Sequence, residues 1–288
     1  FHMIKVSFKN KIYAIPTRWS ELNQIQFMGV SEAMERFESG NCDFEEFKIM
    51  TTVAILQLNT KIMRPTDALY ENLFRISEKL DFPYTIEEKH DSREVSLRVI
   101  LDRQILPQIY DYQGYEFSCR DGMAETSMSA ERYVDAISLM QLYSKKRSDI
   151  VLDRLTAVLY AGSPYGIDSV KSVNAGEIPH RLKIAVYYNF RGILEWIKRL
   201  PKYDILYNGT GSGNTAGSPM GLEGSIYTLA KSGYGSYNDI CNVNLFTYLD
   251  LLLDQSIESV RTLKGAGLKP TEIAEKMHLH PEQIMNLI

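Results

Sequence analysis

The sequence predicts a mainly α-helical protein: a bundle-like globule of several helices, with a short β-hairpin near its N-terminus and a small helical hairpin at its C-terminus. Two observations predict this class. Apolar residues recur at intervals of three and four over most of the chain, which is the spacing of amphipathic helices. Helix-capping residues stand where these segments begin, and glycine or proline stands just beyond many of their ends.

The N-terminal residues 4–15 alternate apolar and polar side chains around Asn10, which predicts a β-hairpin. Pro16 ends the second strand because proline has no N–H group to donate. Trp19 and Leu22 then form an apolar turn that leads into the first helix.

Three helices are expected next, each beginning at a residue suited to the N-cap. Asn23 caps the first, which extends to about Ser39, and Asp43 begins the second. Thr66, which follows Pro65, caps the third.

The segment 81–126 follows neither a helical nor a strand period along its whole length, and Pro83 and Pro107 interrupt it. We therefore expect irregular structure here, with a helix near 92–104 and a short strand at 115–119.

The helical pattern returns in the second half of the chain. One helix begins at Ser129, a second is capped by Ser148, and a third lies between Pro179 and Pro201. Beyond residue 225 we expect shorter helical pieces, a longer helix at 244–263, and two short helices at 270–277 and 281–288.

Residues 208–224 contain six glycines and no strong apolar stretch. This composition is typical of a loop or linker. We expect a main domain over residues 3–207, a loop or linker over 208–224, and a C-terminal helical region over 225–288; whether the glycine-rich segment divides two domains or connects two helices of one stays open.

The overall charge does not favour a nucleic-acid partner, since 32 Lys and Arg residues stand against 36 Asp and Glu residues. Cys42, Cys119 and Cys241 lie far apart without CxxC spacing, which argues against a zinc site or a disulfide framework. No run of about 18 apolar residues suggests a membrane span. The residues after Met3 do not form a signal peptide, so we expect a cytoplasmic protein.

Motifs with known chemistry are weak. Gly211 to Ala216 only loosely matches a dinucleotide fingerprint, and the P-loop lysine is missing. His278 and His280 have no third metal ligand nearby in sequence. We therefore expect no enzyme activity, cofactor or metal; a loop-borne enzyme site in 208–224 is the alternative.

Residues 270–288 fit the apolar pattern of a helix-turn-helix, with His278 at the turn position that glycine usually occupies. The would-be recognition helix from Pro281 to Ile288 has no lysine or arginine, although phosphate and base contacts favour such residues. A small helical hairpin that packs on its own chain or on a partner is the first interpretation, and a DNA-binding regulator is the alternative.

Aromatic residues are numerous, with 18 Tyr, 11 Phe and 2 Trp. Core packing is the usual role of such side chains, but Tyr and Trp are also enriched at protein interfaces. On this basis, and on the motifs described next, we select Trp19, Leu22, Tyr187 and Tyr227 as candidate partner-contact residues.

The pattern Ile15-Pro16-x-x-Trp19-x-Glu21-Leu22-x-x-x-Gln26 resembles the opening of tail-assembly-chaperone-like proteins of tailed bacteriophages and prophages. Three further segments are similar to that family: residues 132–162, 178–197 and 225–252. Residues 264–288 have no counterpart that we can place.

The resemblance implies a non-enzymatic helical protein that assists tail or virion assembly in the cytoplasm of the bacterial host. The implied partners are phage tail proteins, either the tube or the tape-measure protein, and no cofactor is implied. A structural component of the tail or head-tail region of the virion is an alternative, and the oligomeric state stays open.

Overall fold

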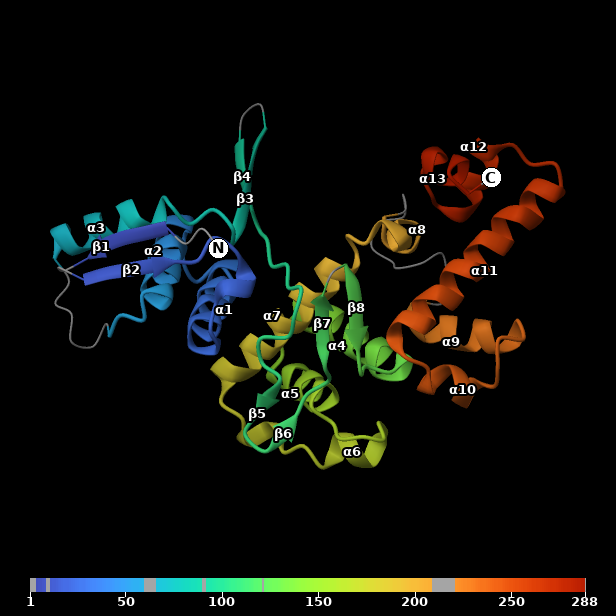
Figure 1. Ribbon diagram of the computed structural model, residues 1–288, viewed down its shortest axis with the longest axis horizontal. Coiled ribbons are helices and arrows are strands. Elements are labelled where there is room, and N and C mark those ends of the chain that lie inside the picture. The colour runs from blue at the N-terminus through green and yellow to red at the C-terminus, as the bar shows by residue number, and fades with distance from the viewer. Residues whose placement is uncertain are drawn as a thin grey trace. The chain divides into compact units, whose positions relative to one another are not determined.

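The computed structural model (Figure 1) describes residues 4–8, 11–59, 66–89, 92–120, 122–208 and 221–287. It is mainly helical, with an antiparallel β-hairpin at the N-terminus and a pair of helices at the C-terminus, which confirms the predicted fold class.

The chain forms two compact units, and each unit combines two separate stretches of sequence. Unit 1 comprises Phe1–Pro107 and Asn174–Ile193, and unit 2 comprises Gln108–Val173 and Leu194–Ile288. This division differs from the expected one, which placed residues 3–207 in one domain and 225–288 in another. Of the expected linker, residues 209–220 lie outside the described part of the chain.

Unit 1 contains the N-terminal hairpin, the first three α-helices, a second hairpin and most of one long helix. Their bounds are β1 Ile4–Phe8, β2 Lys11–Ile15, η1 Trp19–Glu21, α1 Gln24–Glu38, α2 Phe44–Ile55, α3 Asp67–Ser77, β3 Tyr84–Lys89, β4 Ser92–Leu97, η2 Ala175–Glu177 and α7 His180–Ile197. Its main helix contacts pair α1 with α2 and α2 with α3.

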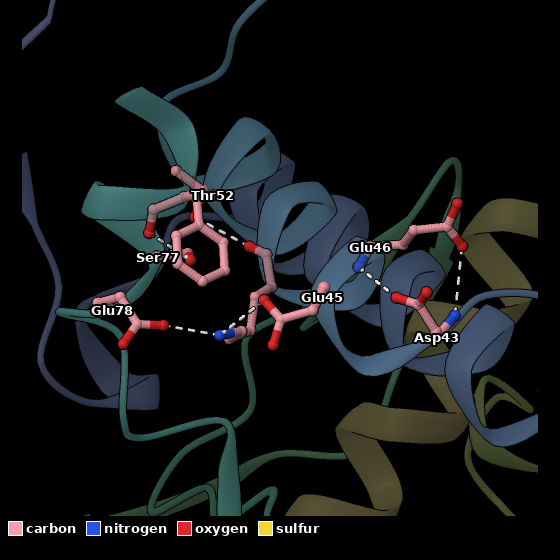
Figure 2. A network of polar contacts seen from close by, with 8 residues as sticks. Asp43, Glu45, Glu46, Thr52, Ser77 and Glu78 are labelled. Carbon is pink, nitrogen blue, oxygen red and sulfur yellow. Dashed lines mark hydrogen bonds and ion pairs between the residues drawn. The ribbon is translucent and has the colours of Figure 1, made fainter. Parts of the chain in front are cut away.

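The caps predicted for the first and third of these helices are confirmed, and the second helix also begins at a cap. Asn23 accepts a hydrogen bond from the Gln26 amide, and Thr66 accepts one from the Leu69 amide. Asp43 forms a reciprocal capping box with Glu46, which Figure 2 shows at the start of α2. These bonds satisfy amide groups that the first turn of a helix leaves unpaired.

The prediction of a helix near 92–104 is wrong, because residues 92–97 form the strand β4, which pairs with β3. The antiparallel register places Tyr84 opposite Leu97 and Ile86 opposite Val95. Since alternate residues of a strand share a face, this pairing gathers four apolar side chains on one side of the ribbon. The short strand expected at 115–119 is confirmed, with slightly shifted bounds, as the strand β7 of unit 2.

Unit 2 consists of short hairpins followed by helices packed around α4. Its elements are β5 Gln108–Ile109, β6 Tyr112–Gln113, β7 Phe117–Arg120, β8 Met123–Thr126, α4 Ala130–Lys146, α5 Asp149–Leu159, α6 Ile167–Lys171, η3 Pro201–Tyr203, α8 Asp204–Tyr207, α9 Gly221–Lys231, α10 Tyr237–Asn242, α11 Leu245–Gly265, α12 Pro270–Met277 and α13 Pro281–Met285.

Buried tyrosines hold α8 and α9 in this same unit. The hydroxyl oxygens of Tyr133 on α4 and Tyr207 on α8 lie 2.5 Å apart, and Ser225 on α9 hydrogen-bonds to Tyr248 on α11. Burial raises the pKa of both Tyr133 and Tyr207, so their hydroxyls stay protonated. The helices on either side of the glycine-rich segment therefore belong to one core, and the chain does not divide there.

Candidate partner-binding groove

The four residues selected from the sequence as partner contacts do not form one surface. Trp19, Leu22 and Tyr187 are buried in unit 1, whereas Tyr227 on α9 is 57% exposed. The indole N–H of Trp19 donates to the Arg98 carbonyl oxygen at 2.8 Å, which fixes the turn after Pro16 against the unit. Because a buried side chain offers no surface to a partner, the structure corrects the selection of these three residues and leaves Tyr227 as the exposed one.

A different surface of unit 1 has the form of a binding site. An open groove with a volume of about 1030 Å³ runs along α1, α2 and α3, and Arg181 at the start of α7 borders it. Its lining includes Gly29 on α1 and Ala54 on α2, which face one another. A Cβ atom added to Gly29 would lie 2.6 Å from the Cβ of Ala54, so only glycine permits this approach without movement.

The groove is mostly lined by apolar side chains that remain in contact with solvent. Ile25 is 65% exposed and Tyr70 is 51% exposed. The other apolar side chains are half-buried or buried; they are Ile49, Met50, Val53, Ala54, Leu58, Leu69 and Leu73. A contiguous apolar surface in contact with water is typical of a place where a partner binds.

Four charged side chains also belong to the lining of the groove. Arg181 forms an ion pair with Glu32, with the two charged atoms 3.0 Å apart. The Glu46 carboxylate accepts the Asp43 amide at 3.2 Å as part of the capping box (Figure 2). Arg36 is the remaining charged residue of the lining. The groove is therefore amphipathic, with both apolar and charged side chains in its lining.

A buried lysine fixes α3 against α2 and thereby sets the position of one groove wall. Lys48 on α2 is only 6% exposed, and its ammonium group lies 2.7 Å from Glu78 and 3.0 Å from Glu45. It also lies 4.4 Å from the centre of the Phe74 ring on α3. Figure 2 shows Glu45 and Glu78 reaching the same cluster from two sides.

Burial lowers the pKa of Lys48, but hydrogen bonds to Glu78 and Glu45 outweigh this effect, so its pKa lies above the ordinary value. Lys48 is therefore a charged structural contact. Sequence reasoning missed it, because a lysine on an apolar helix face gives no signal until its acceptor on another helix is known.

The groove offers apolar and charged contacts to a partner. Within the described ranges, no group of three or more His, Cys, Asp or Glu residues is placed to hold a metal ion. Likewise, none of the helices that the structure describes combines the length and the apolar character needed to cross a membrane.

The C-terminal segment folds as the apolar pattern of a helix-turn-helix predicts. His278 adopts a left-handed conformation, with φ of 55°, at the turn between α12 and α13. The residues of the apolar pattern are all buried; they are Ile273, Ala274, Leu279 and Ile284. However, the Gln283 side chain in the first turn of α13 donates to the Asp204 carboxylate at 2.7 Å, so α13 packs onto α8 of its own unit.

Comparison with known proteins identifies no relative of this chain. No family model, no curated protein and no solved structure matches it.

Proposed function

We propose that this protein acts through non-covalent contacts with other proteins, and that it assists the assembly of a phage tail or virion in the cytoplasm of the bacterial host. The groove along α1, α2 and α3 is the surface that holds the partner. The phage role is supported by the sequence resemblance alone, whereas the contact role is supported by the groove.

The observation that carries the contact role is the exposure of apolar side chains along the groove. Ile25 and Tyr70 keep more than half of their surface in water. Burying such surface is favourable by roughly 25 cal/mol per Å². A partner that covers the groove removes this apolar surface from water, and this burial stabilises the complex relative to the two free proteins.

The first test is association with a defined partner. The full-length chain is mixed with the tail tube protein or the tape-measure protein encoded in the same genome, and co-elution is measured by size-exclusion chromatography. We expect co-elution with one of them. If neither protein associates, the assembly role is contradicted.

A matched pair of substitutions tests the groove itself. Ile25 and Ile150 are each the second residue of a helix, and they are 65% and 67% exposed. Ile25→Asp places a charge in the groove, and Ile150→Asp places one on α5 of unit 2. Co-elution should be lost with Ile25→Asp and kept with Ile150→Asp. Equal binding by both variants would show that the partner binds elsewhere.

A permanent virion component would make the same kind of contact but stay in the particle. Mass spectrometry of purified particles separates the two roles, because an assembly factor is absent from finished particles and a structural component is present at a fixed copy number.

DNA binding is the second candidate function, and the left-handed His278 in the turn between α12 and α13 is the observation that favours it. Its test is a gel shift with duplex DNA over a range of salt concentrations. A DNA-binding role requires a shift that weakens with salt and disappears when residues 263–288 are removed.

A further inference from the structure

We propose that the occupant of the groove is an amphipathic α-helix with an acidic residue, and that Arg36 receives the carboxylate of that residue. This inference rests on the proposed function, in which the groove binds a partner protein, and it adds the chemistry by which the partner is recognised.

The walls of the groove favour a helical occupant. Its lining residues come mainly from α1, α2 and α3. Because most backbone N–H and C=O groups of a helix are bonded within that helix, these walls offer few backbone partners to an occupant. An extended segment lying there would lose water from its own backbone groups without gaining sheet partners, which is unfavourable. A helix satisfies its backbone internally and presents apolar side chains at positions i, i+3, i+4 and i+7.

The charges of the groove favour an acidic residue on that helix. Arg181 is paired with Glu32, and Glu46 is engaged in the capping box at the start of α2. The guanidinium group of Arg36 makes no hydrogen bond or ion pair with any residue that the structure describes. A carboxylate that arrives with an apolar helix can therefore bond to the Arg36 guanidinium without displacing an existing ion pair, whereas a lysine there would be repelled.

The position of Arg36 also sets the arrangement of the occupant. Arg36 lies near the C-terminal end of α1, whereas Ile25 lies near its start. The acidic residue therefore belongs at one end of the bound helix, and the apolar anchors extend from it toward Ile25.

The test is a selection followed by a charge swap. A display library of 16-residue helix-forming peptides is panned on the full-length wild-type chain. Peptides that also bind the Ile25→Asp variant are removed. For each winner, versions with Glu, Gln or Lys at the selected end position are synthesised. Their dissociation constants are measured by fluorescence anisotropy on the wild type, Arg36→Gln and Arg36→Glu, with Arg154→Glu as the control for an exposed helical arginine of unit 2.

We expect the winners to carry an acidic residue at one end. Their Glu versions should bind the wild type about fivefold more tightly than their Gln versions, which is the upper range for an exposed ion pair. Arg36→Gln should remove this preference, Arg36→Glu should make the Lys version the tighter ligand, and Arg154→Glu should change nothing. Circular dichroism confirms that each variant is folded.

Two kinds of failure are distinguishable. If winners discriminate between the wild type and Ile25→Asp but show no charge preference, or one that Arg36→Glu leaves unchanged, the role of Arg36 is contradicted and the groove remains a binding site. If no peptide discriminates between the wild type and Ile25→Asp, the groove does not bind helices and the inference is contradicted, whereas the proposed contact surface is contradicted only if Ile25→Asp and Ile150→Asp co-elute equally with the tail protein.

Discussion

Gly29 on α1 faces Ala54 on α2 at so short a separation that a Cβ atom on Gly29 would lie 2.6 Å from the Cβ of Ala54. Both residues line the groove, and any larger pair would push the two helices apart. The groove therefore depends on Gly29, although glycine inside a helix is less favourable than alanine.

The Gly29 contact predicts that Gly29→Leu lowers the free energy of unfolding by about 1–3 kcal/mol, as overpacked cores do. Urea denaturation followed by circular dichroism measures this change. Gly265→Ala is the matched control, because Gly265 is a helical glycine with nothing within 4 Å of an added Cβ. It should be neutral or stabilising by up to about 1 kcal/mol. Equal effects of the two substitutions would contradict the close packing of α1 on α2.

Lys48 predicts a contrast between two substitutions. Lys48→Met preserves the packing of the side chain against Phe44 and Phe74, and it leaves behind two glutamates whose side chains are more than half exposed. We expect a loss below about 1.5 kcal/mol for Lys48→Met, but about 2–3 kcal/mol for Lys48→Ala, which also leaves a cavity. Similar large losses for both would mean that the charge, and not the packing, holds α3 on α2.

The same lysine predicts a pH dependence at the alkaline end. The pKa of Lys48 is raised in the folded protein, so its amino group holds a proton more tightly in the folded protein than in the unfolded chain. Its contribution to stability is therefore complete below the unfolded value near 10.5 and is lost as the pH rises through the folded value. Thermal unfolding of the wild type and Lys48→Met between pH 9 and pH 11 should show the two stabilities converging. A constant difference would contradict this assignment.

Asp204 predicts the opposite dependence in acid. Hydrogen bonds from Asn208 and Gln283 hold the pKa of Asp204 below its ordinary value of 3.8. The contribution of the ionised Asp204 carboxylate to stability is therefore present above pH 3.8, and it is lost as the pH falls through the lower pKa of Asp204 in the folded protein. Gln283→Ala should therefore destabilise the protein at pH 7 but have a smaller effect at pH 3. An effect of the same size at both pH values would show that the carboxylate does not hold α13.

The Tyr133–Tyr207 pair predicts non-additive effects. Tyr207→Phe leaves the buried Tyr133 hydroxyl without this partner, which costs about 1–3 kcal/mol. The double substitution of both tyrosines by phenylalanine should cost less than the sum of the single substitutions, because no orphaned hydroxyl remains from the pair. Strict additivity in a double-mutant cycle would contradict the hydrogen bond.

Local signals in the sequence were sufficient to predict most helices. The caps Asn23 and Thr66 depend on residues a few positions away, and they form as predicted; Asp43, where the second helix was expected to begin, also caps it. The ribbon at 84–97 was missed because its alternation is short and charged, and its strands become evident only once Ile86 is paired with Val95.

The groove was beyond such reasoning, because its parts meet only in the folded unit. Gly29 and Ala54 come from different helices, and Arg181 comes from a distant stretch of the chain. The burial of Trp19 and Tyr187 was equally undetermined, since an aromatic residue beside apolar neighbours is compatible with a core and with an interface.

Site-specific photo-crosslinking tests the central claim most directly. Tyr70 in the groove and Tyr237 on α10 are 51% and 50% exposed, which makes them a matched pair. Each is replaced by p-benzoylphenylalanine in the full-length chain, the cells are irradiated during phage production, and crosslinked proteins are identified by mass spectrometry. The probe at Tyr70 should crosslink to the tail tube or tape-measure protein, and the probe at Tyr237 should not. No tail-protein product at Tyr70, or equal products at both positions, would contradict the account.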